Sequence, residues 1–383
     1  MAFYYFLFSV GLGIAYASIM LYYWKYWKQL AVFQPTQIKP PLPKVTVIVP
    51  ARNEAANIKA CLESILNQTY PSAYYELIVI DDHSEDETNN IIQSIASPQL
   101  RLFQLKDFLP PDSPINAYKK KAIEIGIQYA TGELILCTDA DCIVPPQWIS
   151  LIANCYLQHN AVLIAAPVHF APANGILSQF QALDFIGMMG ITGAGIQGQF
   201  QHMCNGANLA YTKAAFKEVN GFEGIDHLAS GDDMLLIQKM AKTFPNRITF
   251  LKHPHAAVST PPQPTLNDFI QQRKRWATKS GHYKEWKIIA ILAMVFFCCI
   301  NIVLSIFLIP FFGMWGWGAL MVPLGIKLTI DYFFLSKLCQ FFQRDGLMRS
   351  FWTSQLLHVL YIVGIGIWSN VSKQYQWKGR VTQ

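Results

Sequence analysis

The chain of 383 residues can hold one large domain and something more, but its 52% hydrophobic and 14% charged content is too apolar for a purely soluble enzyme. The formal net charge of +6 is modest, which argues against a nucleic-acid-binding domain, because such domains are usually more basic. The charge suits contact with phosphate groups and with anionic lipid headgroups. The eight cysteines have neither paired metal-ligand spacing nor the spacing of an extracellular disulfide framework, so we expect reduced thiols.

The apolar excess lies at the two ends of the chain. Residues 2–24 carry no charged side chain and are long enough to cross a bilayer. Lys25 and Lys28 follow directly, among tyrosines and tryptophans that suit a membrane interface, and the positive-inside rule puts this end of the span in the cytoplasm. Three further apolar stretches predict a C-terminal transmembrane region: residues 288–312, 315–335 and 351–368.

The middle C-terminal stretch contains Lys327 and Asp331, which are four residues apart and so share one helix face. We expect them to pair inside a helix bundle rather than to mark an ion pathway. The number and orientation of the spans stay open. Three C-terminal spans put the basic residues of the C-terminus outside, against the charge rule. A re-entrant middle stretch instead puts the basic residues between the last two stretches outside.

Between the membrane segments, strand and helix patterns alternate. Short apolar runs at 45–49, 76–80 and 134–138 predict buried strands, and helical patterns at 53–67, at 116–130 and from Pro146 separate or follow them. This alternation predicts a parallel sheet with helices on both faces. The second and third apolar runs end at acidic residues, which we therefore expect at the carboxyl edge of the sheet, where α/β proteins bind ligands.

Three acidic signatures stand out: Asp81-Asp82, Asp139-Ala140-Asp141 and Asp232-Asp233. Carboxylates that lie close together raise each other's pKa unless a positive group lies among them. A divalent metal that carries a phosphorylated ligand would supply that charge, and Mg²⁺ or Mn²⁺ takes oxygen ligands and substrate phosphates. Because a single Asp-X-Asp after a strand is usually part of a turn, this signature gains weight only from the other two. Lys119-Lys120-Lys121 precedes it at a predicted helix start, and a lysine run is as often a solvated face.

Five segments along the chain together carry a family resemblance: Val47–Glu54, Ile80–Thr88, Asp139–Asp141, Ser230–Asp233 and Gln272–Trp276. In this order they resemble the large inverting family 2 of GT-A glycosyltransferases, which includes cellulose, chitin and hyaluronan synthases and ceramide glucosyltransferases. The similarity spans about Lys44 to Trp276, and it differs where many members have Glu-Asp and this chain has Asp232-Asp233. The resemblance implies a GT-A catalytic domain, an α/β fold with a Rossmann-like, mostly parallel sheet, flanked here by transmembrane helices.

The resemblance assigns a nucleotide-sugar site to the first half of the domain. A carboxylate can accept the imide N–H of uracil, which favours a uridine donor. Taken alone, each of these segments is better explained by local structure: a helix cap at residues 52–54 and a turn at residues 81–82. The donor-binding residues implied are Pro50, Ala51, Arg52, Glu54, Asp81, Asp82, Lys119 and Asp139, and the metal ligands are Asp139 and Asp141.

The resemblance places the chemistry on the second half of the domain. Asp233, or Asp232 if the alignment is one residue off, is the general base that takes the acceptor hydroxyl proton. The same pair can also be favourable carboxylates at a helix N-terminus, and both interpretations can hold together. Residues 205–211 resemble the segment that lines the acceptor side. His83, His253 and His255 are interpreted as structural histidines without metal spacing.

The Gln272–Trp276 motif has two interpretations. As an amphipathic interfacial helix, its arginines and tryptophan anchor at lipid headgroups. As a catalytic motif, which the family order favours, Arg275 stabilises the departing diphosphate, Gln272 orients donor or acceptor, and Trp276 stacks beneath a sugar.

These expectations combine into a multi-pass protein of the inner or plasma membrane with a cytoplasmic catalytic domain. It transfers a sugar, with a UDP-linked donor favoured, to a lipid or lipid-linked saccharide by single addition. The alternatives are a processive polysaccharide synthase that needs a channel or flippase partner, and a nucleotide-sugar-binding protein without turnover. The expected segments are a transmembrane helix with a basic flank (1–28), a proline-containing linker (29–43), the GT-A domain (44–260), interfacial helices with the Gln272 motif (261–286) and a C-terminal transmembrane region (287–383).

Overall fold

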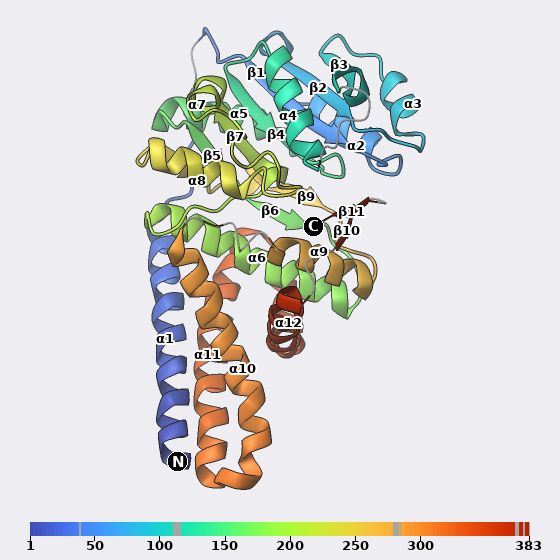
Figure 1. The fold of residues 1–383 in the computed structure, drawn as a ribbon. Coiled ribbons are helices and arrows are strands. Elements are labelled where there is room, and N and C mark those ends of the chain that lie inside the picture. The colour runs from blue at the N-terminus through green and yellow to red at the C-terminus, as the bar shows by residue number, and fades with distance from the viewer. Residues whose placement is uncertain are drawn as a thin grey trace. The chain divides into compact units, whose positions relative to one another are not determined.

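The computed structural model describes residues 1–37, 40–109, 116–278, 283, 285–371, 375–377 and 380–382. It divides into two compact units. An α/β unit contains Ala31–Ala171, His202–Pro261 and Gln376–Gln383, and a helical unit contains Met1–Leu30, Pro172–Gln201 and Pro262–Tyr375. The segment Pro172–Gln201 lies inside the range expected for the GT-A domain but belongs to the helical unit. The colours and labels of Figure 1 identify the elements of each unit.

A mixed sheet of seven strands, among the described residues, forms the centre of the α/β unit, in the order β3-β2-β1-β4-β7-β5-β8. Neighbouring strands β3, β2, β1 and β4 are parallel, and β7 runs antiparallel to both β4 and β5. This confirms the expected α/β class with a mostly parallel sheet. The strands are β1 (Val45–Ala51), β2 (Tyr75–Asp81), β3 (Leu100–Gln104), β4 (Leu134–Cys137), β5 (Leu163–Ala165), β7 (Leu209–Thr212) and β8 (Ile248–Phe250).

Strand β1 is central because its β-branched residues are buried on both faces, as in other parallel strands covered by helices. It runs two residues past the predicted end at Val49, through Pro50 to Ala51. The paired register of β1 with β4 ends at Ile48, whereas that with β2 continues to Ala51 and Asp81. Pro50, which has no N–H to donate, therefore lies where β1 has one paired neighbour.

Helices cover this sheet and connect its strands. The helix α4 packs on β1 and β2 so closely that a Cβ at Gly126 would lie 2.8 Å from Ile48 Cγ2. Strands β6 (Val168–Phe170) and β9 (Val258–Thr260) form a second small parallel sheet, and β10 (Tyr375–Trp377) pairs with β11 (Arg380–Thr382). The helices are α2 (Ile58–Leu66), α3 (Thr88–Gln93), α4 (Tyr118–Tyr129), α5 (Trp148–His159), α7 (Lys213–Glu218) and α8 (Met234–Thr243).

The predicted helix at 53–67 begins later than expected, as α2 at Ile58. Asn53 has a φ of 50°, in the left-handed region that a right-handed helix cannot include. Its side chain accepts a hydrogen bond from the Glu85 amide at 2.9 Å, and its own amide donates to Ser84 Oγ at 3.0 Å. Residues 52–57 therefore form a loop that is tied to the loop after β2.

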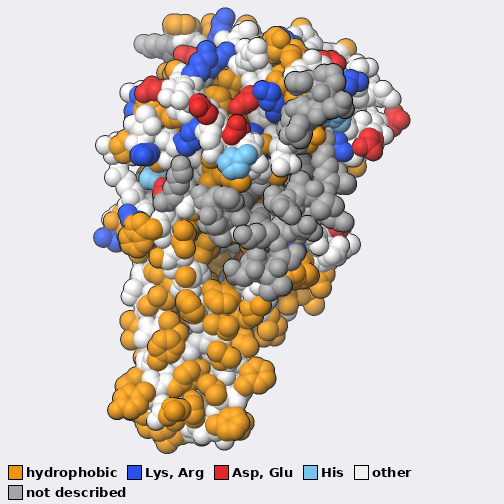
Figure 2. All heavy atoms as spheres, viewed as in Figure 1, with side chains coloured by type: hydrophobic (Ala, Val, Ile, Leu, Met, Phe, Trp, Pro, Cys, Tyr) orange, Lys and Arg blue, Asp and Glu red, His pale blue; other side chains and the backbone are white. Residues whose placement is uncertain are grey.

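The helical unit consists of α1 (Ala2–Gln29), α6 (Ile176–Gln197), α9 (Leu266–Thr278), α10 (Trp286–Phe312), α11 (Met314–Phe341) and α12 (Phe351–Val371). Helices α1, α10 and α11 run side by side, and α6 runs crosswise to them (Figure 1). Four helices of the described chain are long and apolar enough to cross a membrane: Ala2–Gln29, Trp286–Phe312, Met314–Phe341 and Asp345–Trp368. Hydrophobic side chains dominate the visible surface of α1, α10 and α11 (Figure 2).

The expected polar pair in the middle C-terminal stretch is confirmed. Lys327 and Asp331 are both buried in α11 and form an ion pair. Tyr16 of α1 donates to Asp331 Oδ1 at 2.6 Å, and Lys327 donates to Gln355 Oε1 of α12 at 2.8 Å. The charges thus join three helices of the bundle, as expected for polar groups in an apolar surrounding. Helix α11 is continuous over 28 residues, long enough to span a bilayer.

Candidate active site

The acidic signatures meet at one edge of the sheet, as the predicted strand ends indicated. Asp81 is the last residue of β2 and lies opposite Ala51, the last residue of β1. Asp139 comes two residues after the end of β4, the other neighbour of β1. Because β7 is antiparallel to β4, its N-terminal end lies at this same edge, opposite Cys137. The 3₁₀ turn Gly206–Asn208 leads directly into β7 there.

Arg52 links two loops at this edge, the one after β1 and the one after β2. Its Nη1 donates to the carbonyl oxygens of Asp82 and His83 at 2.9 and 2.8 Å, and its Nη2 forms an ion pair with Glu85 at 3.1 Å. Glu54 is buried as well; its carboxylate accepts from Asn57 Nδ2 at 3.0 Å. The Arg52 contacts hold the loop of residues 52–57 against residues 82–85, and the Glu54 contact stabilises the loop itself.

Asp81 is the buried acidic side chain at the end of β2. It is 2% exposed, and in the described part of the chain its Oδ1 has no hydrogen-bond partner. Burial raises the pKa of the Asp81 carboxyl, while hydrogen bonds with Ser84 act against this shift. An unpartnered buried acceptor is costly unless a ligand donates to it. The neighbouring Asp82 is different, because its Oδ1 lies 2.9 Å from His83 Nδ1.

Lys119 connects two acidic signatures. It lies in the first turn of α4, which packs on the sheet, and its Nζ is 2.7 Å from Asp139 Oδ1 and 3.2 Å from Asp232 Oδ2. Burial acts to lower the pKa of the lysine, but the two carboxylates outweigh it and hold this pKa well above its usual value. The side chain is still 23% exposed. Lys119 therefore supplies positive charge among the crowded carboxylates, a role for which the sequence analysis considered only a metal.

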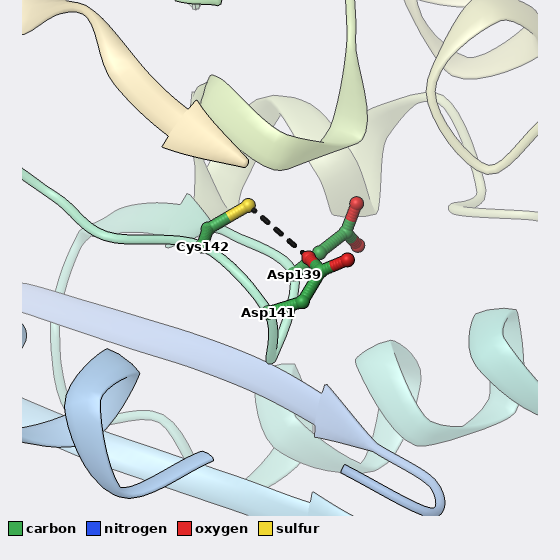
Figure 3. Close-up of side chains that lie close together, drawn as sticks. All are labelled: Asp139, Asp141 and Cys142. Atoms are coloured by element: carbon green, nitrogen blue, oxygen red, sulfur yellow. Dashed lines mark hydrogen bonds between the residues drawn. The ribbon is translucent and has the colours of Figure 1, made fainter. Parts of the chain in front are cut away.

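Asp139 and Asp141 form the acidic part of a candidate metal site with Cys142 (Figure 3). One ligand atom from each of these three residues lies within 4.8 Å of the others. Among the described residues, this is the group found in which at least three His, Cys, Asp or Glu side chains could hold a metal ion. The Cys142 thiol donates to Asp141 Oδ1 at 3.5 Å. Burial first, and then Asp141, raise the pKa of this thiol, which keeps it protonated. The two carboxylates, rather than the thiol, thus suit Mg²⁺ or Mn²⁺.

The last acidic pair lies at the start of α8. Asp233 Oδ1 accepts from the Met234 amide at 2.6 Å, and its Oδ2 accepts from the Gly206 amide at 3.1 Å. Asp233 is therefore a helix N-terminal carboxylate, as one interpretation expected, and it also lies beside the 3₁₀ turn before β7. Asp232 is mostly buried and paired with Lys119. The structure thus joins Lys119, Asp139, Asp232, Asp233 and Gly206 in one cluster.

Two models of known families match the chain: Glycosyl transferase family 2 at residues 46–219, and Glycosyl transferase family group 2 at residues 134–367. The second match covers more than half of the chain. The chain belongs to glycosyltransferase family 2. The resemblance that the five sequence segments indicated is thereby confirmed.

Curated relatives of this family 2 glycosyltransferase include glycosyltransferase AglE of Haloferax volcanii, 28% identical over 197 residues that cover 50% of this chain and 60% of that one. The probable glycosyltransferase YdaM of Bacillus subtilis is 25% identical over 258 residues, which cover 65% of this chain and 58% of that one. The matched region therefore spans less than two thirds of the length of these relatives.

The mannosyltransferase PcManGT from Pyrobaculum calidifontis, solved in complex with GDP-Man and Mn²⁺, has a similar fold. It matches with a TM-score of 0.55 at 18% identity, over 92% of this chain and 99% of that one. Together with the sheet, this confirms the expected GT-A fold for the family 2 glycosyltransferase.

The Gln272–Trp276 motif of this family 2 chain lies on α9, in the helical unit. Gln272, Arg275 and Trp276 are partly exposed, whereas Arg273, which the sequence analysis did not single out, is 2% exposed. Arg273 pairs with Asp184 of α6 at 2.8 Å, and its guanidinium carbon lies 4.3 Å from the centre of the Trp276 ring. Burial raises the pKa of Asp184, against the attraction of Arg273.

Sequence reasoning missed two further residues of the α/β unit. Lys120 is 2% exposed and donates to backbone carbonyls, although a lysine run suggested a solvated face. The spacing to Ile123 and Ile127, both buried on α4, could have placed Lys120 on the inner face of the helix. The second is Cys142, which lies beside Asp139 and Asp141 in the structure. Its distance in the sequence from the other cysteines is not a metal-ligand spacing, so no sequence pattern indicated this position. All eight cysteines are free and buried, consistent with the expected thiols.

Proposed function

We propose that this protein is an inverting glycosyltransferase that transfers a sugar from a nucleotide donor to a lipid or a lipid-linked saccharide at a membrane. The observation that carries the proposal is the cluster around Lys119, which draws together carboxylates from two separate segments at the carboxyl edge of a GT-A sheet. The four apolar helices support a membrane-embedded acceptor. Inner- or plasma-membrane location, with the α/β unit in the cytoplasm, is part of this proposal.

The donor side of the proposal rests on Asp81. Its buried, unpartnered oxygen is suited to accept an N–H from a nucleobase. Pro50 and Ala51 lie at the end of the neighbouring strand β1, and we expect their backbone to approach the base and the ribose. Arg52 and Glu54 hold the surrounding loops in place. Uracil offers one imide N–H and guanine offers two donors on the same edge, so both donor classes belong in the test. We favour the uridine donor.

On the acceptor side, we assign the general base to Asp233. In an inverting transfer, the acceptor hydroxyl oxygen forms a bond to the anomeric carbon as the bond to the diphosphate breaks, and the hydroxyl proton passes to the base. The amides of Met234 and Gly206 hold the Asp233 carboxylate in one orientation, which is what a positioned base needs. Lys119 lies where it can attract the donor phosphates. A Mg²⁺ or Mn²⁺ ion held by Asp139 and Asp141 would neutralise charge on the departing diphosphate.

The test is transfer by detergent-purified protein with a panel of UDP- and GDP-linked sugars, Mg²⁺ or Mn²⁺, and a membrane lipid extract as acceptor. Product is detected by mass spectrometry as a lipid that gains one sugar. Asp233→Asn is the matched control, because Asn keeps the helix cap and removes the base. We expect one donor class to give a singly glycosylated lipid with the native protein only. If the protein neither transfers sugar from any donor nor hydrolyses any donor, the proposal is overturned in favour of a binding protein without turnover.

The length of the saccharide product distinguishes single addition from the second candidate function. A processive polysaccharide synthase with a channel or flippase partner would make long chains from little acceptor. We consider the four candidate spans found among the described residues few for a secretion channel, and we therefore favour single addition.

A further inference from the structure

The loop before the proposed base is held by lysine side chains. This loop joins α7 to α8, carries Asp232 and Asp233 at its end, and has neither helix nor strand in its described backbone. Its backbone polar groups therefore need partners outside regular secondary structure. Lys120 Nζ donates to three of its carbonyl oxygens, those of Ile225, Leu228 and Ser230, at 2.7, 2.6 and 2.9 Å.

The Lys120 ammonium matches these three carbonyls. An ammonium has three N–H donors and accepts nothing, so three acceptors satisfy it completely. The side chain is 2% exposed, and a buried charge is tolerated only when it is fully hydrogen-bonded. Ser230, the last of the three acceptors, is two residues from Asp232 and three from Asp233. The carbonyl cage thus ends next to the acidic pair.

The neighbouring lysines of α4 have different partners. Lys119 pairs with Asp139 and Asp232, whereas Lys121 lies at the surface near Glu124, 3.4 Å away. At the other end of the loop, Lys239 of α8 donates to the carbonyls of Gly221 and Glu223 at 2.6 and 2.9 Å. Each half of the loop is therefore held by one ammonium, and Lys120 holds the half that leads into the acidic pair.

We propose that Lys120 is a positioning residue for the transfer reaction: its ammonium fills the carbonyl cage of Ile225, Leu228 and Ser230 and thereby holds Asp233 at the Gly206 amide. This inference rests on the proposed function of Asp233 as the base. Lys120 itself touches neither donor nor acceptor in this scheme. Its loss moves the base while the donor contacts of Lys119 and Asp81 stay in place.

Lys120→Met, which keeps the length and apolar stem of the side chain, tests this in the purified full-length protein. Because a displacement of about 1 Å at a reacting group can cost ~100-fold, we expect kcat to fall by roughly 10- to 100-fold. Donor affinity should stay within about twofold, since the donor contacts are retained. Lys121→Met is the control and should leave both quantities unchanged.

A second variant separates positioning from a purely structural role. Lys120→Ala removes the side chain beyond Cβ, and n-propylammonium has the same three carbons and ammonium group. We expect n-propylammonium to restore part of kcat to Lys120→Ala, whereas neutral 1-propanol restores none. The Lys121→Ala variant should not respond to either compound.

Hydrogen exchange gives a readout that does not depend on turnover. The amides of residues 225–233 should exchange faster in Lys120→Met than in the native protein and slow again in Lys120→Ala with n-propylammonium. Native exchange and native kcat in Lys120→Met would overturn the inference. Loss of folding in both variants, without rescue, would also overturn it, because Lys120 would then serve the fold as a whole. If the native protein is inactive but the loop amides still exchange faster in Lys120→Met, the proposed function is refuted. The role of Lys120 in the carbonyl cage then stands.

Discussion

The ammonium of Lys119 lies 2.7 Å from Asp139 Oδ1, although Lys119 belongs to the first turn of α4 and Asp139 follows β4. The same nitrogen lies 3.2 Å from Asp232 Oδ2, in the loop before α8. One lysine thus carries the counter-charge for two acidic signatures that are far apart in the sequence. Removal of that charge leaves the carboxylates to repel each other.

The first prediction concerns this charge. Lys119→Met should raise the donor KM and lower kcat, because the donor phosphates and the carboxylates lose a shared cation. Without the cation the carboxylates are left to repel each other and the donor phosphates. Steady-state kinetics that give kcat and KM separately measure this, with Lys121→Met as the control. Native KM and native kcat would show that Lys119 is only a surface-type ion pair.

The second prediction concerns the metal. Asp141→Asn removes a charge and nearly preserves the shape of the side chain, so the protein should still fold. The loss of several kcal/mol of transition-state stabilisation should lower the transfer rate about 10²- to 10⁴-fold. Mn²⁺ binding, followed by electron paramagnetic resonance of the free ion, should weaken in parallel. Cys142→Ser should leave Mn²⁺ affinity nearly unchanged, because we assign the carboxylates and not the thiol as ligands. Full activity of metal-depleted protein in excess EDTA would contradict the prediction.

The third prediction separates the two carboxylates before α8. Asp233→Asn should leave donor binding nearly intact and lower transfer by about 10²- to 10⁴-fold, the range for a general base. Asn also caps helices, so the thermal stability of this variant should stay close to native. Asp232→Asn should be milder, because Lys119 keeps Asp139 as a partner. Reversed phenotypes would identify Asp232 as the base.

The sequence predicted the sheet edge better than it predicted the contacts across it. Asp81 and Asp139 lie at the carboxyl ends of strands, a placement that follows from the strand pattern alone. The partner of Lys119 could not be predicted in the same way. Because β7 is antiparallel to β4, the turn before β7 lies at this edge, and the Gly206 amide of that turn donates to Asp233 while Lys119 pairs with Asp232. Such long-range pairing leaves no periodic signal in the sequence.

Arg52 shows a second limit of the sequence pattern. Family order implied donor binding, but the guanidinium bonds to the loop after β2, through the carbonyls of Asp82 and His83. The positive φ of Asn53 makes this loop possible, and a pattern of apolar spacing does not reveal it. The buried partners Asp184 and Arg273 were likewise missed, since a single acidic residue in an apolar helix gives no sign of its partner.

The fourth prediction uses the raised pKa of Asp81. Because burial raises this pKa above the ordinary value of 3.8, part of the carboxyl is protonated in acid solution. The ionised form is the better acceptor for a base N–H, so donor affinity should rise with pH through that pKa and then level off, with proton release on binding. Calorimetry in buffers of different ionisation enthalpy counts the protons. Asp81→Asn should bind more weakly and release none, whereas equal proton release in this variant would assign the titration to another group.

The last prediction concerns α9, where anchoring and catalysis lead to opposite results. If Arg275 only anchors the helix at lipid headgroups, Arg275→Lys should be mild, since lysine also suits headgroups. If Arg275 binds a diphosphate, the exchange loses a planar fork of donors and should cut kcat sharply. We expect the sharp loss, with membrane association and thermal stability unchanged.

Arg273 supplies the matched control on the same helix. It is buried against Asp184 and stacks on Trp276, so Arg273→Met leaves a buried carboxylate without its partner and should destabilise the protein by about 3–5 kcal/mol. Thermal unfolding in detergent should therefore distinguish a structural arginine at 273 from a functional one at 275. Trp276→Tyr keeps an interfacial aromatic ring but changes the stacking surface. We expect it to lower kcat, as Arg275→Lys does. Near-native turnover of Arg275→Lys in detergent would mean that the motif anchors the helix and does not act on the donor.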